Sequence, residues 1–128
     1  MSIASRLAPL AIVAAALMAA TGAHADDRIC RGTISGQKID GDIKVPRGAS
    51  CVVANSRIDG NIQLDKGRRI SLRNNRVDGD IQLMGNRGSI VVQGNRVDGN
   101  LQCKSNSQRP TGGNNRVDGN KEDQCVRL

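Results

Sequence analysis

An internal repeat constrains the fold of this chain more than any other feature. Its motif is a basic residue, an aliphatic residue, Asp, Gly, Asp or Asn, and a second aliphatic residue. Five copies begin at Lys38, Arg57, Arg76, Arg96 and Arg116. The Asp recurs at intervals of 19, 19, 20 and 20 residues. A fixed period of this length indicates an architecture in which each copy forms one structural unit.

Aligning the copies produces columns of aliphatic residues. Two columns flank the Asp-Gly pair: Ile39, Ile58, Val77, Val97 and Val117, and Ile43, Ile62, Ile81 and Leu101. Three more are Val45, Leu64, Leu83 and Cys103; Ile34, Val53, Leu72 and Val92; and Cys51, Ile70 and Ile90. Several columns lie two residues apart, which is the period of side chains on one face of a strand. Helix is disfavoured because no stripe with a helical period appears.

A turn of about 20 residues with several short strands is typical of one coil in a parallel β-helix. Successive coils would pair at about 4.8 Å and stack each column in a narrow interior. The lack of Phe, Tyr and Trp agrees with an interior filled by aliphatic residues of one size. We therefore predict an all-β fold, a short right-handed parallel β-helix (β-solenoid) of about five coils, since parallel crossovers are usually right-handed. The alternative is an antiparallel barrel or sandwich.

Two corners of each coil are visible in the sequence. Gly recurs directly after the motif Asp, and we expect a positive φ there, which Gly adopts at little cost. These glycines are Gly41, Gly60, Gly79, Gly99 and Gly119. A second corner is expected where Asn or Gly recurs, because Asn also tolerates the left-handed region. Its residues are Gly36, Asn55, Asn74, Gly94 and Asn114.

The four cysteines are spaced for two disulfides. Cys30 and Cys51 are 21 residues apart, and Cys103 and Cys125 are 22 residues apart. Residues one coil apart lie within the Cα distance that a disulfide requires. We therefore predict Cys30–Cys51 and Cys103–Cys125, one near each end of the solenoid. Lys121 and Asp123 occupy columns that are aliphatic elsewhere, so the chain is expected to leave the core there.

The first 25 residues have the pattern of a secretory signal peptide. Arg6 precedes an apolar stretch from Leu7 to Ala20, and Ala23-His24-Ala25 provides a small-residue cleavage site. We assign residues 1–25 to the signal peptide and 26–128 to one β-solenoid domain. The location predicted is secreted or periplasmic, which agrees with paired cysteines.

The positive charge of the mature chain has two interpretations: it serves solubility only, or it favours anionic partners at the cell surface. Residues 26–128 contain 18 Lys and Arg against 12 Asp and Glu. An anionic polysaccharide or another envelope polymer is the expected kind of partner. Nucleic acid is not expected, because the chain is exported and has no aromatic side chain to stack on bases.

The motif also predicts a charged surface. The aliphatic residue between the basic residue and the Asp points inward, so both charged columns should point outward. The basic column is Lys38, Arg57, Arg76, Arg96 and Arg116, and the acidic column includes Asp59, Asp78 and Asp98. Two interpretations follow: a self-compensating solvated face, or a linear binding site for a repeating ligand such as a polysaccharide.

Metal binding and catalysis have little support in the sequence. The Asp column with Asp42 and Asp80 offers oxygen ligands for Ca²⁺, but its spacing differs from that of calcium β-rolls and an Arg lies beside each Asp. No cofactor or metal is therefore expected. No His remains after residue 25, so Ser and Cys lack their usual general base. We predict a non-catalytic structural or binding protein; the alternatives are a polysaccharide lyase or hydrolase and a self-assembling surface scaffold.

The last third of the chain resembles a group of uncharacterised secreted bacterial proteins. The resemblance rests on Gly94 to Cys103 and on Gly119 to Cys125, which match GN-x-V-x-GNLQC and GNKE-x-QC. It also rests on Pro110 to Asn114, which match the start of PTG-x-GN except that Asn114 stands where the pattern has Gly. It implies secretion and no particular activity. The coils from Ile34 to Leu101 are more distantly similar to bactofilins, which implies a polymer-forming β-helix.

Overall fold

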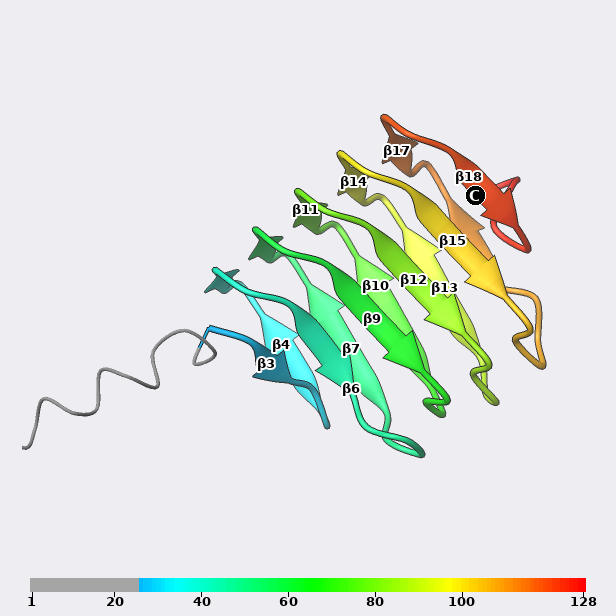
Figure 1. The fold of residues 1–128 in the computed structure, drawn as a ribbon, viewed down its shortest axis with the longest axis horizontal. Helices are drawn as coiled ribbons and strands as arrows, with labels where there is room; N and C mark the ends of the chain where they lie inside the picture. Colours follow the sequence, from blue (N-terminus) through cyan, green and yellow to red (C-terminus); the bar gives the residue numbers. More distant parts are fainter. Residues whose placement is uncertain (1–25) are drawn as a thin grey trace, which may run out of the picture.

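The computed structural model describes residues 26–128, which form a stack of similar coils (Figure 1). The predicted signal peptide lies outside the described residues. Each coil contributes one short strand to each of three sheets, and all strand pairs are parallel. The described residues contain no helix, and therefore no helix that is long and apolar enough to cross a membrane.

The three sheets are named here in chain order within a coil. Sheet 1 contains β4 (Thr33–Ser35), β7 (Cys51–Ala54), β10 (Ile70–Arg73), β13 (Ile90–Gln93) and β16 (Thr111–Gly113). Sheet 2 contains β5 (Lys38–Ile39), β8 (Arg57–Ile58), β11 (Arg76–Val77), β14 (Arg96–Val97) and β17 (Arg116–Val117). Sheet 3 contains β3 (Arg28–Ile29), β6 (Ile43–Val45), β9 (Ile62–Asp65), β12 (Ile81–Met84), β15 (Leu101–Lys104) and β18 (Lys121–Asp123).

The strand register confirms the predicted columns. Ile70 pairs with Cys51 and Ile90, and Ile81 pairs with Ile62 and Leu101. The inward side chains of the central coils are 0–1% exposed, whereas the alternate residues of the same strands are partly or fully exposed. The chain is thus a parallel β-solenoid of about five coils, with its core in the space between the three sheets.

Both predicted disulfides are present, one near each end. Cys30 is bonded to Cys51 with a Cα–Cα distance of 5.6 Å, and Cys103 to Cys125 with 5.3 Å. At the C-terminal end the aliphatic columns stop, but strand pairing continues, since Lys121 pairs with Leu101. A turn then returns Cys125 to the interior, where it is fully buried. The chain therefore leaves the core, as expected, only over β18 and returns to it at Cys125.

The first corner, between sheets 1 and 2, contains a buried column of polar side chains. Its residues are Ser56, Asn75, Asn95 and Asn115. Asn95 accepts hydrogen bonds at Oδ1 from the backbone N–H and the Nδ2 of Asn75, at 3.0 and 3.1 Å. Its own Nδ2 donates to the carbonyl of Leu72 at 2.9 Å and to Oδ1 of Asn115 at 3.0 Å. Each asparagine thus accepts from a backbone N–H at the bend of the preceding coil and also donates to a strand carbonyl.

The third corner, between sheet 3 and sheet 1 of the next coil, repeats this arrangement. Oδ1 of Asn86 accepts from the backbone N–H of Gly67 at 2.7 Å, and Nδ2 of Asn86 donates to the carbonyl of Leu64 at 2.9 Å. Oδ1 of Asn106 likewise accepts from the backbone N–H and the Nδ2 of Asn86. Gln124 is the last residue of the column, and its Oε1 accepts from Nδ2 of Asn106. Sequence analysis did not identify either interior column, although Asn75, Asn95 and Asn115 precede the motif in three successive copies.

The predicted positive φ at the motif glycines is wrong. Positive φ occurs at Gly36, Asn55, Asn74, Gly94 and Asn114, which confirms the other predicted corner. The glycines after the motif Asp lie at the second corner, between sheets 2 and 3, and none of them has a positive φ. Glycine is required there by close approach: a Cβ on Gly79 would overlap Oδ1 of Asn61 and lie 2.8 Å from the carbonyl oxygen of Gly60.

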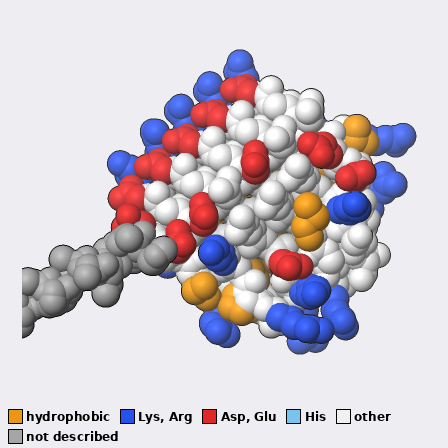
Figure 2. All heavy atoms as spheres, viewed as in Figure 1, with side chains coloured by type: hydrophobic (Ala, Val, Ile, Leu, Met, Phe, Trp, Pro, Cys, Tyr) orange, Lys and Arg blue, Asp and Glu red, His pale blue; other side chains and the backbone are white. Residues whose placement is uncertain are grey.

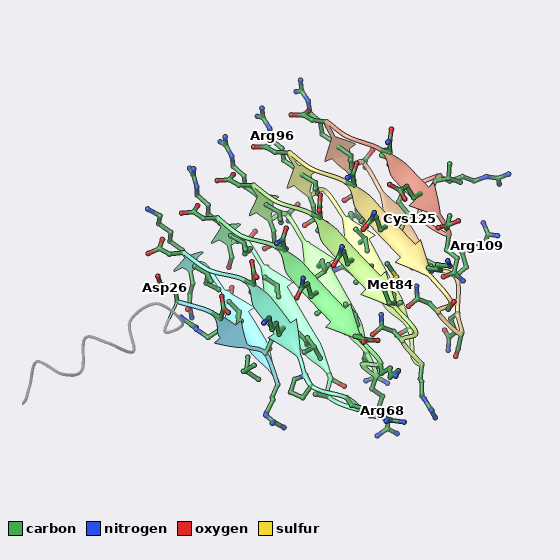
Figure 3. The ribbon with its side chains drawn as sticks, in the orientation of Figure 1. Asp26, Arg68, Met84, Arg96, Arg109 and Cys125 are labelled. Atoms are coloured by element: carbon green, nitrogen blue, oxygen red, sulfur yellow. A yellow bond between two sulfur atoms is a disulfide. The ribbon has the colours of Figure 1, made fainter. Side chains whose placement is uncertain are left out.

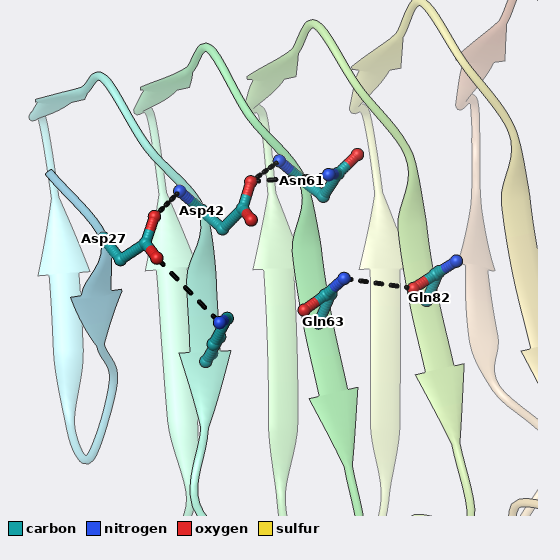
Figure 4. A network of polar contacts seen from close by, with 6 residues as sticks. Asp27, Asp42, Asn61, Gln63 and Gln82 are labelled. Atoms are coloured by element: carbon teal, nitrogen blue, oxygen red, sulfur yellow. Dashed lines mark hydrogen bonds and ion pairs between the residues drawn. The ribbon is translucent and has the colours of Figure 1, made fainter. Parts of the chain in front are cut away.

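The Asp or Asn side chain that lies against each motif glycine forms a hydrogen bond between successive coils (Figure 4). Oδ1 of Asp42 accepts from the backbone N–H of Asn61 at 2.7 Å, and Oδ1 of Asn61 accepts from the N–H of Asp80 at 2.8 Å. Asp27 begins this series and Asn100 continues it to Asn120. The Asp or Asn after each motif glycine is therefore a structural hydrogen-bond acceptor, and the glycine makes room for the acceptor of the preceding coil.

We predict that Gly79→Ala lowers the free energy of unfolding by about 1–3 kcal/mol, the usual cost of overpacking. The added methyl group must displace the Asn61 side chain and the Gly60 backbone. Gly32→Ala is the matched control, because nothing lies within 4 Å of a Cβ at Gly32. Urea denaturation measures both; equal stabilities for the two variants would contradict the close approach at the second corner.

We also predict that Asn95→Leu destabilises the protein by about 3 kcal/mol or more, despite the similar size of the two side chains. The substitution leaves the buried backbone N–H of Asn75 and one of its Nδ2 hydrogens without an acceptor, each costing about 1–3 kcal/mol. Asn114→Gly should be nearly neutral, because Asn114 is exposed and has a φ of 56° that glycine adopts readily. A leucine variant as stable as the parent would show that the asparagine column is dispensable.

Candidate functional site

The predicted basic column is continuous and faces solvent. Arg76 pairs with Arg57 and Arg96 in sheet 2, and Lys38 and Arg116 extend the row at its ends. The inward residue next to each of them occupies the core, so the basic side chains point outward, as predicted. Figure 2 shows the row along one edge of the molecule, beside a row of acidic side chains. We call the two rows the Arg/Asp ladder.

Carboxylates compensate the central arginines of the ladder. Arg57 Nε lies 3.3 Å from Asp59 Oδ1 in its own coil, and Arg57 Nη2 lies 3.7 Å from Asp78 Oδ2 in the next coil. Arg76 Nε lies 3.9 Å from Asp78 Oδ1. The arginine side chains are 48–49% exposed and the carboxylates 32–35%. Each coil therefore places one basic and one acidic side chain next to each other, and the net charge of the ladder is close to zero.

A shallow groove runs along the ladder on the side away from the carboxylates. Four coils contribute to its lining at the first corner. The lining residues are Gly36, Gln37, Lys38, Asn55, Ser56, Arg57, Asn74, Asn75, Arg76, Gly94 and Arg96. We call this feature the Arg groove. Because it crosses the coils, it offers one basic side chain about every 4.8 Å.

The structure brings the predicted site residues together in an ordered way. Lys38, Arg57, Arg76 and Arg96 line the Arg groove, whereas Asp59 and Asp78 lie on its outer side as ion-pair partners. Arg116 and Asp98 continue the rows toward the C-terminal end. Sequence analysis missed the amide side chains of Asn55 and Asn74, although their place in the predicted corner was a usable signal.

The chemistry of the groove is that of hydrogen bonding. Guanidinium groups donate, and the amides of Asn55 and Asn74 both donate and accept. No group of three His, Cys, Asp or Glu residues with metal-binding geometry occurs within residues 26–128. Asp59 and Asp78 lie within 3.9 Å of arginine nitrogens, so a cation bound by them would compete with these arginines.

We predict that Asp78→Asn lowers the free energy of unfolding by no more than about 1 kcal/mol, because exposed ion pairs contribute about 0–1 kcal/mol. A double-mutant cycle with Arg57→Gln should give a coupling of a few tenths of a kcal/mol. Asp118→Asn is the control, since Asp118 forms no ion pair with any described residue. Zero coupling would mean that Arg57 does not bridge the two coils in solution.

Comparison of the chain with protein-family models, with curated proteins and with solved structures found no match. The Arg/Asp ladder and the Arg groove are therefore interpreted from their own geometry.

Proposed function

We propose that this chain is an exported, non-catalytic binding or structural protein of the cell envelope or secretome, and that it holds a repetitive polymer along the Arg groove. The observation that supports this proposal is the in-register row of basic side chains, one per coil, beside a groove that crosses four coils. A site with a translational repeat is suited to a ligand that also repeats along its length.

The charge balance of the ladder favours a polymer rich in hydroxyl groups. Asp59 and Asp78 already occupy the neighbouring side of Arg57 and Arg76. The remaining donors and the corner amides then face a ligand without a large excess of positive charge. Sugar hydroxyls both donate and accept, so a neutral or weakly charged polysaccharide matches these groups.

Export is supported by the disulfides and by the leader pattern. Two disulfides and no free cysteine among the described residues suggest an extracellular or otherwise oxidising environment. Residues 1–25 have the composition of a signal peptide. The non-catalytic assignment is supported by chemistry, because the cysteines are consumed in disulfides and residues 26–128 contain no His.

The proposal predicts that Arg57→Gln/Arg76→Gln/Arg96→Gln abolishes polymer binding while the fold is retained. The three side chains point outward, so the melting temperature should fall only modestly. Binding is measured by co-sedimentation of residues 26–128 with insoluble peptidoglycan, chitin and cellulose. Binding by the parent should depend weakly on salt, because hydrogen bonds rather than net charge hold the polymer.

Arg31→Gln/Arg73→Gln/Arg127→Gln is the control for this variant. It removes the same charge from exposed positions outside the groove. If the groove variant melts lower than the parent but binds each polymer equally well, the ladder has a structural role only and the proposal fails. Failure of the parent to bind any of the three polymers would also count against it.

A further inference from the structure

The excess positive charge of the protein lies at the third corner, not on the ladder. This corner is formed in successive coils by residues 46–50, 65–69, 84–89 and 104–110. Its basic residues are Arg47, Lys66, Arg68, Arg69, Arg87, Lys104 and Arg109, and its one acidic residue is Asp65. We call these seven residues the basic corner. Figure 3 places Arg68 and Arg96 at opposite edges of the molecule, so the basic corner and the ladder are separate surfaces.

The basic corner is not neutralised by the protein. The ion pairs among residues 26–128 involve Lys44, Arg57 and Arg76 and no residue of the basic corner. Arg68, Arg69 and Arg87 are all exposed. Like charges on adjacent coils repel one another, so an anion bound there would relieve an unfavourable interaction of the free protein.

Two adjacent hollows lie between these side chains, and both are lined by Arg68 and Gly88. The first also contains Arg69, Ser50, Ser89 and Gln108, which combine charged and neutral donors. The second also contains Arg47, Lys66 and Arg87. Gly88 packs directly against the backbone of the preceding coil, where a Cβ would overlap the carbonyl oxygen of Arg68. Both hollows cross the same successive coils and lie side by side, so one ligand can contact both.

The chemistry of the hollows points to oxyanions. Arginine presents a planar set of donors that matches sulfate, phosphate and carboxylate groups, and hydroxyl and amide donors supplement it. The two large hydrophobic side chains exposed in the described chain, Ile29 and Val126, belong to β3 and to the C-terminal turn. The corner therefore has charge without an apolar group for insertion among lipids, which favours a soluble polyanion over a membrane surface.

We propose that the basic corner is a second binding surface, which takes an acidic polysaccharide with its anionic groups in the two hollows. This inference rests on the proposed function in one respect, that the exported protein binds polymers. The surface, the ligand charge and the expected salt dependence all differ from those of the Arg groove. A polyanion held by several cations binds with an affinity that falls steeply with salt.

The test compares two triple variants with the same change in net charge. Arg68→Gln/Arg69→Gln/Arg87→Gln alters the basic corner, and Arg57→Gln/Arg76→Gln/Arg96→Gln alters the groove. Calorimetric titration with heparin and with polygalacturonate, at several salt concentrations, should show an affinity loss of about tenfold or more for the corner variant. Its salt slope should fall by about one per contact removed. The groove variant should stay within about threefold of the parent.

Several results would overturn the inference. Equal losses of affinity in both variants would show that net charge alone attracts the polymer. If the parent binds neither heparin nor polygalacturonate, the basic corner is not a polyanion site. Duplex DNA or anionic vesicles bound as tightly as heparin would mean that the ligand class is wrong. Co-sedimentation with chitin and cellulose, which are neutral, reports on the groove separately, since the corner variant should bind them as the parent does. Unchanged melting of the corner variant confirms that its fold is intact.

Discussion

Parallel pairing between successive coils is the interaction on which the rest of this structure depends. Each residue lies next to its own counterpart one coil away, at about 4.8 Å, in all three sheets. Any side chain placed in the repeat therefore contacts copies of itself. Aliphatic residues gain from this contact, and a column of Ile, Val and Leu fills the interior without aromatic residues.

Asparagine solves the problem that pairing leaves at the corners. A bend takes backbone N–H groups out of the ladder of strand hydrogen bonds, and burial makes unpaired groups costly. The amide has one acceptor and two donor hydrogens, so a stacked Asn can serve the coil on each side. Asn75, Asn95 and Asn86 do so while 2% exposed or less. The interior polar columns and the motif glycines are thus part of the same system of contacts between coils.

The same stacking has opposite consequences for the two charged surfaces. On the ladder, every basic residue has an Asp two positions later, and the two columns together are close to neutral. At the basic corner the cations of successive coils have no such partner. On the ladder, paired charges help to fix the register of the coils and leave hydrogen-bonding groups on the surface. At the basic corner, unpaired cations repel one another, and a bound polyanion would reduce this repulsion. This contrast is why we assign a hydroxyl-rich polymer to the groove and an acidic one to the basic corner.

The sequence by itself determined the repeat length, the β-solenoid class, the five aliphatic columns, both disulfides and the outward ladder. These follow from periodicity, because a stacked repeat places equivalent residues together whatever the details of the bends. The tertiary structure decided what depends on the path of the chain at the corners. It showed that Asn75 and Asn86 point inward, that Gly79 is required by close approach rather than by φ, and that Arg47, Arg68 and Arg87 share one surface. The last group was missed because the corner segments differ in sequence and length, so their charges form no column until the coils are stacked.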